Sequence, residues 1–356
     1  MRKFLNCSLL VIGVCVGCCN FANAVETKPA EQNSAIVQNE EIYEAPNYDK
    51  VVPIPGWTRQ SGDSATTIKE WKRWWSYLNR KTPVIMDWIN NLKLRIYPGN
   101  EVFRSLFVRG IYDPNLVVVL NALLPRDGVL IDVGSNMGYC SLLASTVVGE
   151  DGKVFAIEPS ERDFVRLLDN VNINGLKNVS TYRLIISDKE GEETISIASE
   201  ERSALNTTGV EFSYKGIEKL RAETVRATTI DRFIESENVG KIDVLKLDIE
   251  GSESRALKGA RNAIEKFRPA IILGLNETSL QANNSSIDEV NKLLKELRYK
   301  AYDISSDGRF QLTEITDIKK AKNKVIVCLH ESFIPPALPQ PISKDWSKVV
   351  HDFFTR

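Results

Sequence analysis

Two acids and two glycines follow one another at a spacing that predicts a ligand-binding turn. Asp132, Gly134 and Gly138 form D-x-G-x-x-x-G, and Glu158 lies 20 residues after Gly138. Glycines at these points let the backbone approach a ligand closely, and an acid in the place of Glu158 can accept both hydroxyls of a ribose. A dinucleotide-binding fingerprint would have its first glycine at position 132. The acid found there favours an adenosine ligand with a cationic amino-acid end.

These residues are expected at one edge of an α/β sheet. Residues 129–133 form a continuous apolar run, which is typical of a strand buried on both faces of a parallel sheet. An apolar, helix-compatible segment follows at 141–148, and the next strand is expected at 153–158. Open α/β sheets bind their ligands at the carboxyl ends of the strands. The predicted strand, turn and helix therefore bring the acids to that edge.

Here and in several further stretches, the sequence resembles the FkbM family of S-adenosylmethionine-dependent methyltransferases, from about residue 92 to residue 331. The matching stretches are YPGNEVFRSLFVRGIYDP (97–114), DVGSNMGY (132–139), AIEPSERDFVRLLDNVNINGL (156–176), RLIISDKEG (183–191), TTIDRFI (228–234) and KIDVLKLDIEGSESRALKGA (241–260). The K-x-D-x-E-G core that begins at Lys246 is the most specific of them. The resemblance implies S-adenosylmethionine as cofactor and a hydroxyl of a sugar, glycan or polyketide-like small molecule as methyl acceptor.

Two positions differ from the family pattern. The family usually has Glu where Asp113 stands, and it often has an acid where this chain has Gly274. The nearest acid to Gly274 is Glu277. We therefore expect the acceptor side of the pocket to differ from that of other family members.

Further side chains are predicted to contact the cofactor. Asn136 is expected to bond within the turn or to the cofactor's carboxylate, and Asp113 either meets its ammonium group or caps the helix that follows. Ser187 and Asp188 come after the third expected strand, where such folds contact the adenine, and Asp188 is expected to accept from its amino group. The complete predicted cofactor-binding set is Asp113, Asp132, Gly134, Asn136, Gly138, Glu158, Ser187 and Asp188.

Two acids at the end of the fourth expected strand are the predicted catalytic residues. An acceptor hydroxyl must lose its proton, and a carboxylate at this place can take it as a general base. We expect Asp248 to face the methionine end of the cofactor or the acceptor, and Glu250 to shape the acceptor site. The alternative, in which Glu250 caps the helix at residue 252, has nearly equal support. Glu253 is expected to complement the dipole of that helix.

A resident metal ion is not expected. The sulfonium of the cofactor is already a strong electrophile, so positioning can supply most of the acceleration. His330 and His351 are the only histidines, and they lack metal-ligand spacing. A metal site formed by four carboxylates as hard oxygen ligands is the less favoured alternative. These carboxylates are Asp132, Asp248, Glu250 and Glu253.

The N-terminus has the layout of a secretory signal peptide. Arg2 and Lys3 precede an apolar run at 9–19, and Ala22 and Ala24 form an A-x-A cleavage site. This run of 11 residues is shorter than the roughly 18 to 20 that a spanning helix needs, so we expect cleavage after Ala24. An uncleaved anchor is the alternative. Both place the domain outside the cytosol, and a cytoplasmic protein is expected if the segment is not functional.

The rest of the chain divides by composition. The expected parts are a disordered linker at 25–66, a helical extension at 67–93, the methyltransferase domain at 94–334 and a tail at 335–356. Trp71, Trp74 and Trp75 recur at helical spacing, which favours a helix docked on the domain. Neighbouring cations leave a lid or a peripheral membrane contact as the alternative.

Charge and cysteine content exclude some protein classes. The formal net charge is −1, and it becomes −3 without the first 24 residues, which does not favour nucleic acid as a partner. Beyond those residues only Cys140 and Cys328 remain. They cannot form a disulfide framework, and we expect two buried thiols.

The expected fold is a class I, Rossmann-like methyltransferase with a seven-stranded, mostly parallel sheet and helices on both faces. Strands are expected near 129–133, 153–158, 179–186, 242–248, 270–275, 299–303 and 324–330. Helices are expected near 115–124, 138–148, 161–174, 229–236, 252–266 and 286–297. The polar stretch 191–226 has two alternating segments and reads as a hairpin-like insertion that shapes substrate access.

The predicted function is therefore methylation of a hydroxyl, by S-adenosylmethionine, on a sugar, glycan or small molecule. One alternative is an exported, non-catalytic protein that keeps the fold, because S-adenosylmethionine is made in the cytosol. A nicotinamide-dependent oxidoreductase is disfavoured by Asp132 and by the K-x-D-x-E-G core. Acceptor identity and oligomeric state do not follow from the sequence.

Overall fold

A computed structural model describes residues 83–97, 99–209, 212, 216–305, 311–321 and 324–334. Four predicted features lie outside these residues, wholly or for the most part. They are the signal segment 1–24, the linker 25–66, the tryptophan stripe of the extension and the tail 335–356. Within the described residues, no helix has both the length and the apolar character needed to cross a membrane.

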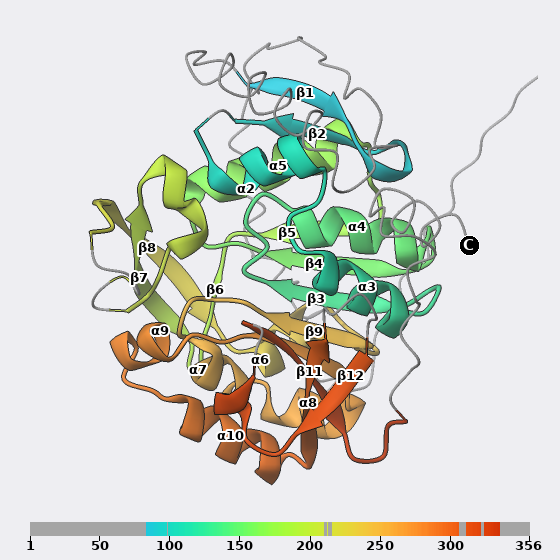
Figure 1. Cartoon of the computed structure of the whole chain (residues 1–356), viewed down its shortest axis with the longest axis vertical. Helices are drawn as coiled ribbons and strands as arrows, with labels where there is room; N and C mark the ends of the chain where they lie inside the picture. The colour runs from blue at the N-terminus through green and yellow to red at the C-terminus, as the bar shows by residue number, and fades with distance from the viewer. Residues whose placement is uncertain are drawn as a thin grey trace, which may run out of the picture. The chain divides into compact units, whose positions relative to one another are not determined.

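The centre of the fold is a mixed sheet (Figure 1). In order across the sheet, its strands are β12 (Gln311–Ile315), β11 (Tyr299–Ser305), β13 (Val325–His330), β10 (Ala270–Gly274), β9 (Val244–Leu247), β3 (Val129–Val133), β4 (Lys153–Ile157) and β5 (Val179–Tyr182). The strands from β10 to β5 are parallel, and β13 is antiparallel to both of its neighbours. This arrangement confirms the class I methyltransferase fold. The expected count of seven strands is wrong by one, because β12 pairs with β11 at the edge.

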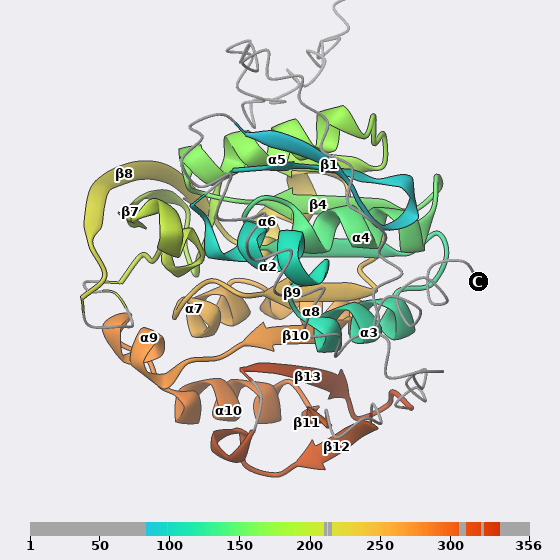
Figure 2. The same cartoon turned by 45° about the horizontal axis from the view of Figure 1, so that its top comes forward.

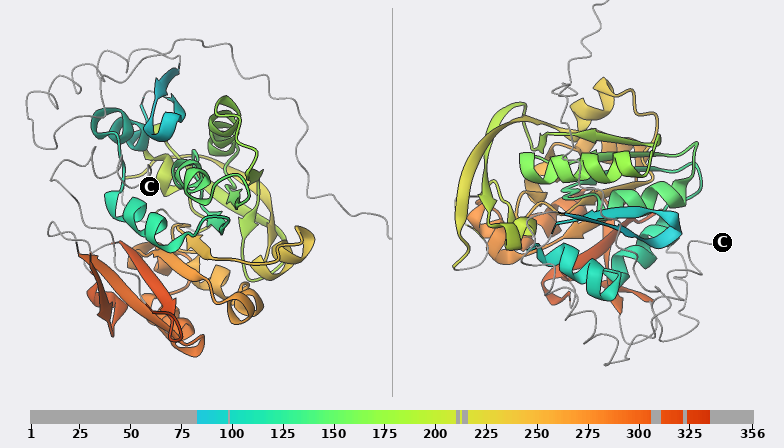
Figure 3. Two further views of the ribbon diagram at one scale, coloured as in Figure 1. Left: turned by 90° about the vertical axis from the view of Figure 1, so that its right-hand side faces the viewer. Right: turned by 90° about the horizontal axis from the view of Figure 1, so that it is seen from above.

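Helices cover both faces of this sheet (Figures 1 and 3). They are α2 (Glu101–Arg109), α3 (Pro114–Leu123), α4 (Tyr139–Val148), α5 (Glu161–Ile173), α6 (Ile230–Ser236), α7 (Glu253–Lys258), α8 (Arg261–Phe267), α9 (Glu277–Ala282) and α10 (Ile287–Glu296). Val154 and Ala156 of β4 share one apolar cluster with α3, α4 and α5. Phe155 points the other way and meets Phe233 of α6 at 5.8 Å between ring centroids. A strand buried on both faces explains why β4 has no alternating polar residues.

The predicted helix at 252–266 is two helices. The chain bends between α7 and α8, where Gly259 presses against the backbone of the segment after β6 (Ile185–Ile186). A Cβ on Gly259 would lie 2.1 Å from the carbonyl oxygen of Ser187. The close approach therefore requires glycine, and the helical pattern is interrupted there.

The insertion forms a second sheet, as its two alternating segments predict. β7 (Gly191–Ala198) and β8 (Lys219–Thr228) pair antiparallel, and β6 pairs with β8. Figure 2 shows β7 and β8 at the side of the central sheet where the arrow of β10 ends. The single strand expected at 179–186 is a wrong prediction, because β5 ends at Tyr182 and β6 belongs to this second sheet. A short 3-10 helix, η2 (Glu200–Leu205), connects β7 to the rest of the insertion.

The helical extension expected up to residue 93 is wrong over its described part. A hairpin forms instead, with β1 (Val84–Asp87), the 3-10 turn η1 (Ile89–Asn91) and β2 (Lys93–Ile96). Asn90 and Asn91 have φ values of 54° and 61°, which asparagine tolerates better than most residues. The amide of Arg95 in β2 donates to Asn170 on α5 at 2.7 Å. Tertiary contact with α5 thus outweighs the local helical pattern.

One short helix and two cysteines complete the description of the fold. The 3-10 helix η3 (Ile318–Lys320) precedes β13. Cys140 on α4 and Cys328 in β13 are buried free thiols, which confirms the expectation for both cysteines.

Candidate active site

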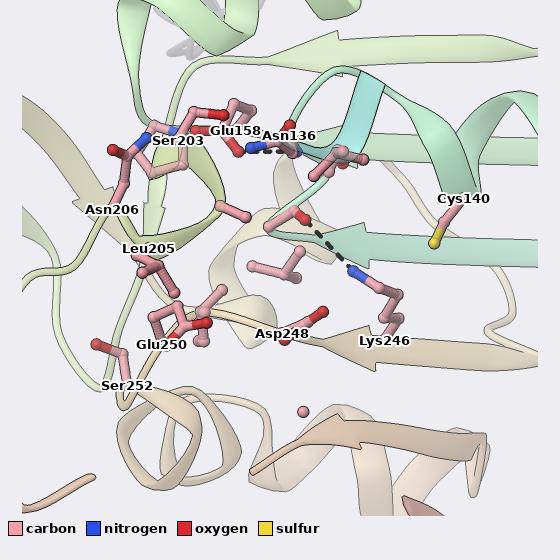
Figure 4. Close-up of a pocket in the computed structure, with 18 of the residues that line it drawn as sticks. Asn136, Cys140, Glu158, Ser203, Leu205, Asn206, Lys246, Asp248, Glu250 and Ser252 are labelled. Carbon is pink, nitrogen blue, oxygen red and sulfur yellow. Dashed lines mark hydrogen bonds between the residues drawn. The ribbon is translucent and has the colours of Figure 1, made fainter. Parts of the chain in front are cut away.

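A cavity of about 480 Å³ opens at the carboxyl ends of the central strands (Figure 4). Its walls come from the turns after β3, β4, β9 and β10, from the start of α3 and from the insertion. The polar residues that line it include Tyr112, Asp113, Asn136, Glu158, Arg202, Asn206, Thr208, Asp248, Glu250, Glu253, Asn276 and Lys324. This is the edge at which the sequence predicts ligand binding.

The glycine turn after β3 is folded tightly against its neighbours. The amides of Gly134 and Ser135 both donate to the carbonyl of Ile157 at 3.0 Å. Gly134 has a φ of 77°, and a Cβ there would lie 2.1 Å from the carbonyl oxygen of Asp248. The turn therefore needs glycine at position 134 for both its conformation and its fit, and Gly134 lines the cavity as predicted. Gly138, with a φ of 95°, directly precedes α4, and its amide donates to the Ser135 carbonyl at 2.9 Å. It does not line the described cavity, where the sequence predicts a cofactor contact.

Glu158 and Asn136 meet beside this turn. The Asn136 amide donates to Glu158 Oε2 at 2.9 Å, and the Ser160 amide donates to Oε1 at 2.9 Å. Glu158 is buried, and desolvation followed by repulsion from the Asp163 carboxylate raises its pKa. The two amide bonds hold the carboxyl group in one orientation at the cavity wall. Both residues are where the sequence analysis expects them.

Asn136 also has an unused acceptor. Its side-chain oxygen Oδ1 is buried and has no hydrogen-bond partner within the described part of the chain. A buried acceptor of this kind is costly unless a ligand or water satisfies it. This atom therefore fits a ligand that brings a hydrogen-bond donor to the turn.

Asp132 is buried beneath the turn and does not line the cavity, so its predicted place at the cofactor is corrected. Its Oδ1 accepts from Lys246 Nζ at 3.0 Å, and its Oδ2 accepts from Ser141 Oγ at 2.6 Å. Burial lowers the pKa of Lys246, but the Asp132 carboxylate outweighs it and holds that pKa above its usual value. Lys246 Nζ also donates to the Gly134 carbonyl at 3.3 Å. The buried ion pair thus supports the turn from beneath and neutralises the acid.

Asp248 faces the cavity, as predicted. It follows β9, and its side chain is exposed although the strand before it is buried. Gly274 lies beside it at the end of β10, where a Cβ would come within 2.0 Å of Asp248 Oδ1. The absence of a side chain at 274 therefore leaves room for the Asp248 carboxylate. This contact gives a physical reason for glycine where the family often has an acid.

Glu250 and Glu253 have different tasks in the turn after β9. Ser279 Oγ of α9 donates to Glu250 Oε2 at 3.0 Å, and Glu250 lines the cavity. The amides of Ile249 and Gly251 donate to the Glu253 carboxyl at 3.0 to 3.3 Å. Burial raises the pKa of Glu253 to about 8. The residue that ties the turn to α7 is therefore Glu253, and not Glu250 as the alternative had it.

Ser187 and Asp188 do not line the described cavity, so the structure does not place them where the adenine contacts are predicted. Asp188 Oδ1 accepts from Arg255 Nε at 3.3 Å, and Ser187 Oγ donates to Glu193 Oε1 at 2.7 Å. This polar cluster joins the insertion to α7 and lies outside the described cavity wall. β5 ends at Tyr182, and Leu184 lines the cavity after it.

Asp113 caps the helix that follows it, as one of its two expected roles requires, and its contact with the cofactor stays a prediction. Its Oδ1 accepts from the amides of Asn115 and Leu116 and so caps α3, and it also lines the cavity. Burial raises its pKa against the effect of these two amides. The neighbouring Tyr112 is 43% exposed, and burial of its phenol together with nearby carboxylates raises its pKa to about 12. Tyr112 therefore stays protonated and able to donate.

Several wall residues escaped the sequence analysis. They come from the insertion and from the segments after β10 and before β13: Arg202, Asn206, Thr208, Asn276 and Lys324. The hairpin pattern predicts the insertion itself, but no local pattern shows which of its side chains face the cavity. In the described residues, no group of three or more His, Cys, Asp or Glu side chains is arranged to hold a metal ion.

The central sheet has the topology of the class I methyltransferase fold. Residues 132–301 match the family model for the methyltransferase FkbM domain. The resemblance to the FkbM family that the sequence predicts is thereby confirmed over these residues.

Two characterised proteins are similar in sequence. The hexuronic acid methyltransferase AglP of Haloferax volcanii is 30% identical over 175 residues, which are 48% of this chain and 65% of that protein. The AMB antimetabolite synthetase AmbE of Pseudomonas aeruginosa is 26% identical over 232 residues, which are 57% of this chain and 11% of that protein. The chain thus spans less than two thirds of the length of either relative.

Solved methyltransferase structures are more distant. The FkbM methyltransferase of Methylobacillus flagellatus is 14% identical, with a TM-score of 0.37 over 75% of this chain and 60% of that one. An S-adenosylmethionine-dependent O-methyltransferase of Thermotoga maritima is 15% identical, with a TM-score of 0.34 over 62% of this chain and 66% of that one.

Proposed function

We propose that this protein transfers a methyl group from S-adenosylmethionine to a hydroxyl of a sugar, a glycan or a related small molecule. The observation that carries the proposal is one cavity that joins two kinds of site. Glu158 and Asn136 offer fixed acceptors beside a glycine turn, and the Asp248 carboxylate is exposed in the same space. The first pair fits a nucleoside, and the last group fits an acceptor that must lose a proton.

The cofactor would supply an electrophilic methyl group on a sulfonium. Glu158 would accept from the ribose hydroxyls, and the unpartnered Asn136 Oδ1 would accept from the ligand's polar end. The turn at Gly134 lines the cavity and would lie against the ligand. These are tasks of binding and orientation, which account for much of the acceleration in a reaction of this type.

Asp248 would act on the acceptor. The acceptor oxygen forms a bond to the methyl carbon while the carbon–sulfur bond breaks, and the sulfur keeps that electron pair. The hydroxyl proton passes to the Asp248 carboxylate, so that a methyl ether and S-adenosylhomocysteine are the products. Glu250 and Tyr112 line the same space and would hold the acceptor's other hydroxyls.

A sugar acceptor is supported by the relative from Haloferax volcanii, which is named for a hexuronic acid substrate. The test is transfer of labelled methyl from S-adenosylmethionine to a panel of neutral sugars, hexuronic acids and hydroxylated small molecules. We expect label in a base-stable methyl ether, lost in Asp248→Asn. Transfer only to a carboxylate, which gives a base-labile ester, would contradict the proposed hydroxyl chemistry.

We also propose that the chain is exported, on the strength of its N-terminal charge and apolar pattern. Such a location would separate the enzyme from cytosolic S-adenosylmethionine, and this favours a non-catalytic protein with the same fold as the second candidate. Fractionation of cells that produce the full chain tests the location. Methyl transfer by the purified full chain would exclude the second candidate.

A further inference from the structure

Glu250 has a backbone conformation that its residue type disfavours. Its φ is 46°, in the left-handed region, and the following Gly251 has a φ of 106°. A non-glycine residue stays there only when its surroundings hold it. Figure 4 shows Glu250 and Asp248 at the wall of the cavity, both carried by the turn after β9. Contacts from outside this turn are therefore needed to maintain it.

Two segments that are remote in sequence hold the Glu250 carbonyl. Thr207 Oγ1 donates to this oxygen at 2.9 Å, and Asn283 Nδ2 donates to it at 3.3 Å. Thr207 belongs to the insertion, and Asn283 ends α9. The Asn283 amide is itself fixed, because Nδ2 also donates to the Ser279 carbonyl at 3.0 Å and Oδ1 accepts from Thr208 Oγ1 at 3.0 Å.

The same segments hold the rest of the turn. The hydroxyls of Ser252 and Thr208 lie 2.6 Å apart, and Ser279 Oγ donates to Glu250 Oε2. A Cβ on Gly251 would lie 2.1 Å from the Ser279 carbonyl oxygen, so the turn is pressed against α9. Backbone and carboxylate of Glu250 are thus both tied to elements outside the K-x-D-x-E-G core.

We propose that Thr207 and Asn283 are positioning residues for the acceptor half of the cavity. Their hydrogen bonds to the Glu250 carbonyl keep the turn in the left-handed conformation that presents the Glu250 carboxylate beside Asp248. The insertion then does more than shape access, because it helps to set the geometry of the acids that meet the acceptor. This inference rests on the proposed function for its effect on turnover.

The hydrogen bonds from Thr207 and Asn283 to the Glu250 carbonyl, which we call the clamp, can be tested without methyl transfer. In Asn283→Ala of the full chain, amide hydrogen exchange in peptides that span 248–253 should rise, because the Ile249 and Gly251 amides lie in the turn that loses its anchor. Gln281→Ala is the matched control, since Gln281 is an exposed residue of the same helix whose side chain donates to Glu277. Unchanged exchange in a folded Asn283→Ala protein would overturn the clamp.

Kinetic measurements on the Asn283 variant distinguish a positioning role from a contribution to stability alone. Asn283→Ala should lower kcat by about tenfold or more, as expected for small misplacements near reacting groups, and leave cofactor affinity within about twofold. In a Glu250→Gln background the same substitution should add little, because its effect passes through Glu250. Thr207→Val should act like Asn283→Ala, and Gln281→Ala should act like the wild type.

Two results distinguish the failure of this inference from that of the proposed function. If the decrease in kcat of the Asn283→Ala, Glu250→Gln double variant equals the product of the two single decreases, the positioning role is overturned. The proposed methyl transfer would not be affected by that result. A wild-type protein that methylates none of the acceptors would overturn the proposed function, and the clamp would then be judged by hydrogen exchange alone. Increased exchange with unchanged turnover would also contradict the positioning role.

Discussion

The two halves of the cavity are built from different kinds of sequence. The cofactor half lies within one continuous unit, from the turn at Gly134 to Glu158, and backbone amides fix its groups. The acceptor half is assembled from the turn after β9, the insertion and α9, and side-chain hydrogen bonds hold it together. The two halves meet where the Gly134 turn packs against Lys246 and the Asp248 carbonyl.

The carboxylates of the two halves also differ in their use. Asp132 is neutralised by Lys246 beneath the turn, and Glu158 is buried with two amide partners. Asp248 is exposed in the cavity, where an acceptor can reach it. Acids of the first half organise the backbone and the cofactor, and those of the second half face the reacting hydroxyl. Substitutions should therefore separate affinity for the cofactor from turnover.

The largest expected effect is on the acceptor half. Asp248→Asn keeps the size of the side chain but removes its capacity to take a proton. We expect kcat to fall by about 10²- to 10⁴-fold, with cofactor affinity changed by no more than about threefold. Steady-state kinetics and calorimetry on the same preparation measure the two quantities. A large loss of cofactor affinity with normal turnover at saturation would reverse the assignment of the two halves.

The next effect is on the cofactor half. Glu158→Ala removes the group that would accept from both ribose hydroxyls and strips the Asn136 and Ser160 amides of their partner. Affinity for S-adenosylmethionine should fall by about 10- to 100-fold, since two hydrogen bonds of about 0.5 to 1.5 kcal/mol each would be lost. The control is Asp188→Ala, which should bind normally because Asp188 pairs with Arg255. Equal losses of cofactor affinity in the two variants would contradict a cofactor site that contains Glu158 and leaves out Asp188.

A smaller effect is expected at the boundary between β10 and the turn after β9. In Gly274→Ala the new methyl group would meet Asp248 Oδ1 and push the carboxylate away from its position. We expect about a tenfold decrease in kcat with unchanged cofactor affinity and a melting temperature close to that of the wild type. Full activity in this variant would show that the fit between Gly274 and Asp248 does not matter for the reaction.

The smallest effect concerns stability and pH. Burial raises the pKa of Glu253 to about 8. Above its usual pKa the unfolded chain loses this proton while the native protein keeps it, so the contribution to stability is present at low pH and is lost as the pH rises through about 8. The melting temperature should therefore decrease between about pH 5 and 9, and less steeply in Glu253→Gln. Glu158, whose pKa is also raised, leaves a residual slope in both proteins. If the melting temperature depends on pH equally in the wild type and in Glu253→Gln, Glu253 does not carry a proton in the native protein.

The sequence predicts the central sheet and the cofactor half well for a physical reason. A continuous apolar run, a glycine turn and a helix form a local unit, so Gly134 and Glu158 can be placed from their neighbours alone. Asp132 is misassigned because its partner, Lys246, lies 114 residues away in the chain. Asp188 is misassigned because β5 ends at Tyr182, where the strand pattern continues. Thr207 and Asn283 carry no local pattern, since their importance arises only from long-range contacts.

The most direct test of the account is a calorimetric titration of the purified full chain with S-adenosylmethionine, S-adenosylhomocysteine and NAD. The account predicts saturable binding of the first two at one site per chain and no binding of NAD. A protein that is folded by circular dichroism and binds neither S-adenosylmethionine nor S-adenosylhomocysteine would contradict it, and would favour a non-catalytic protein that keeps the fold.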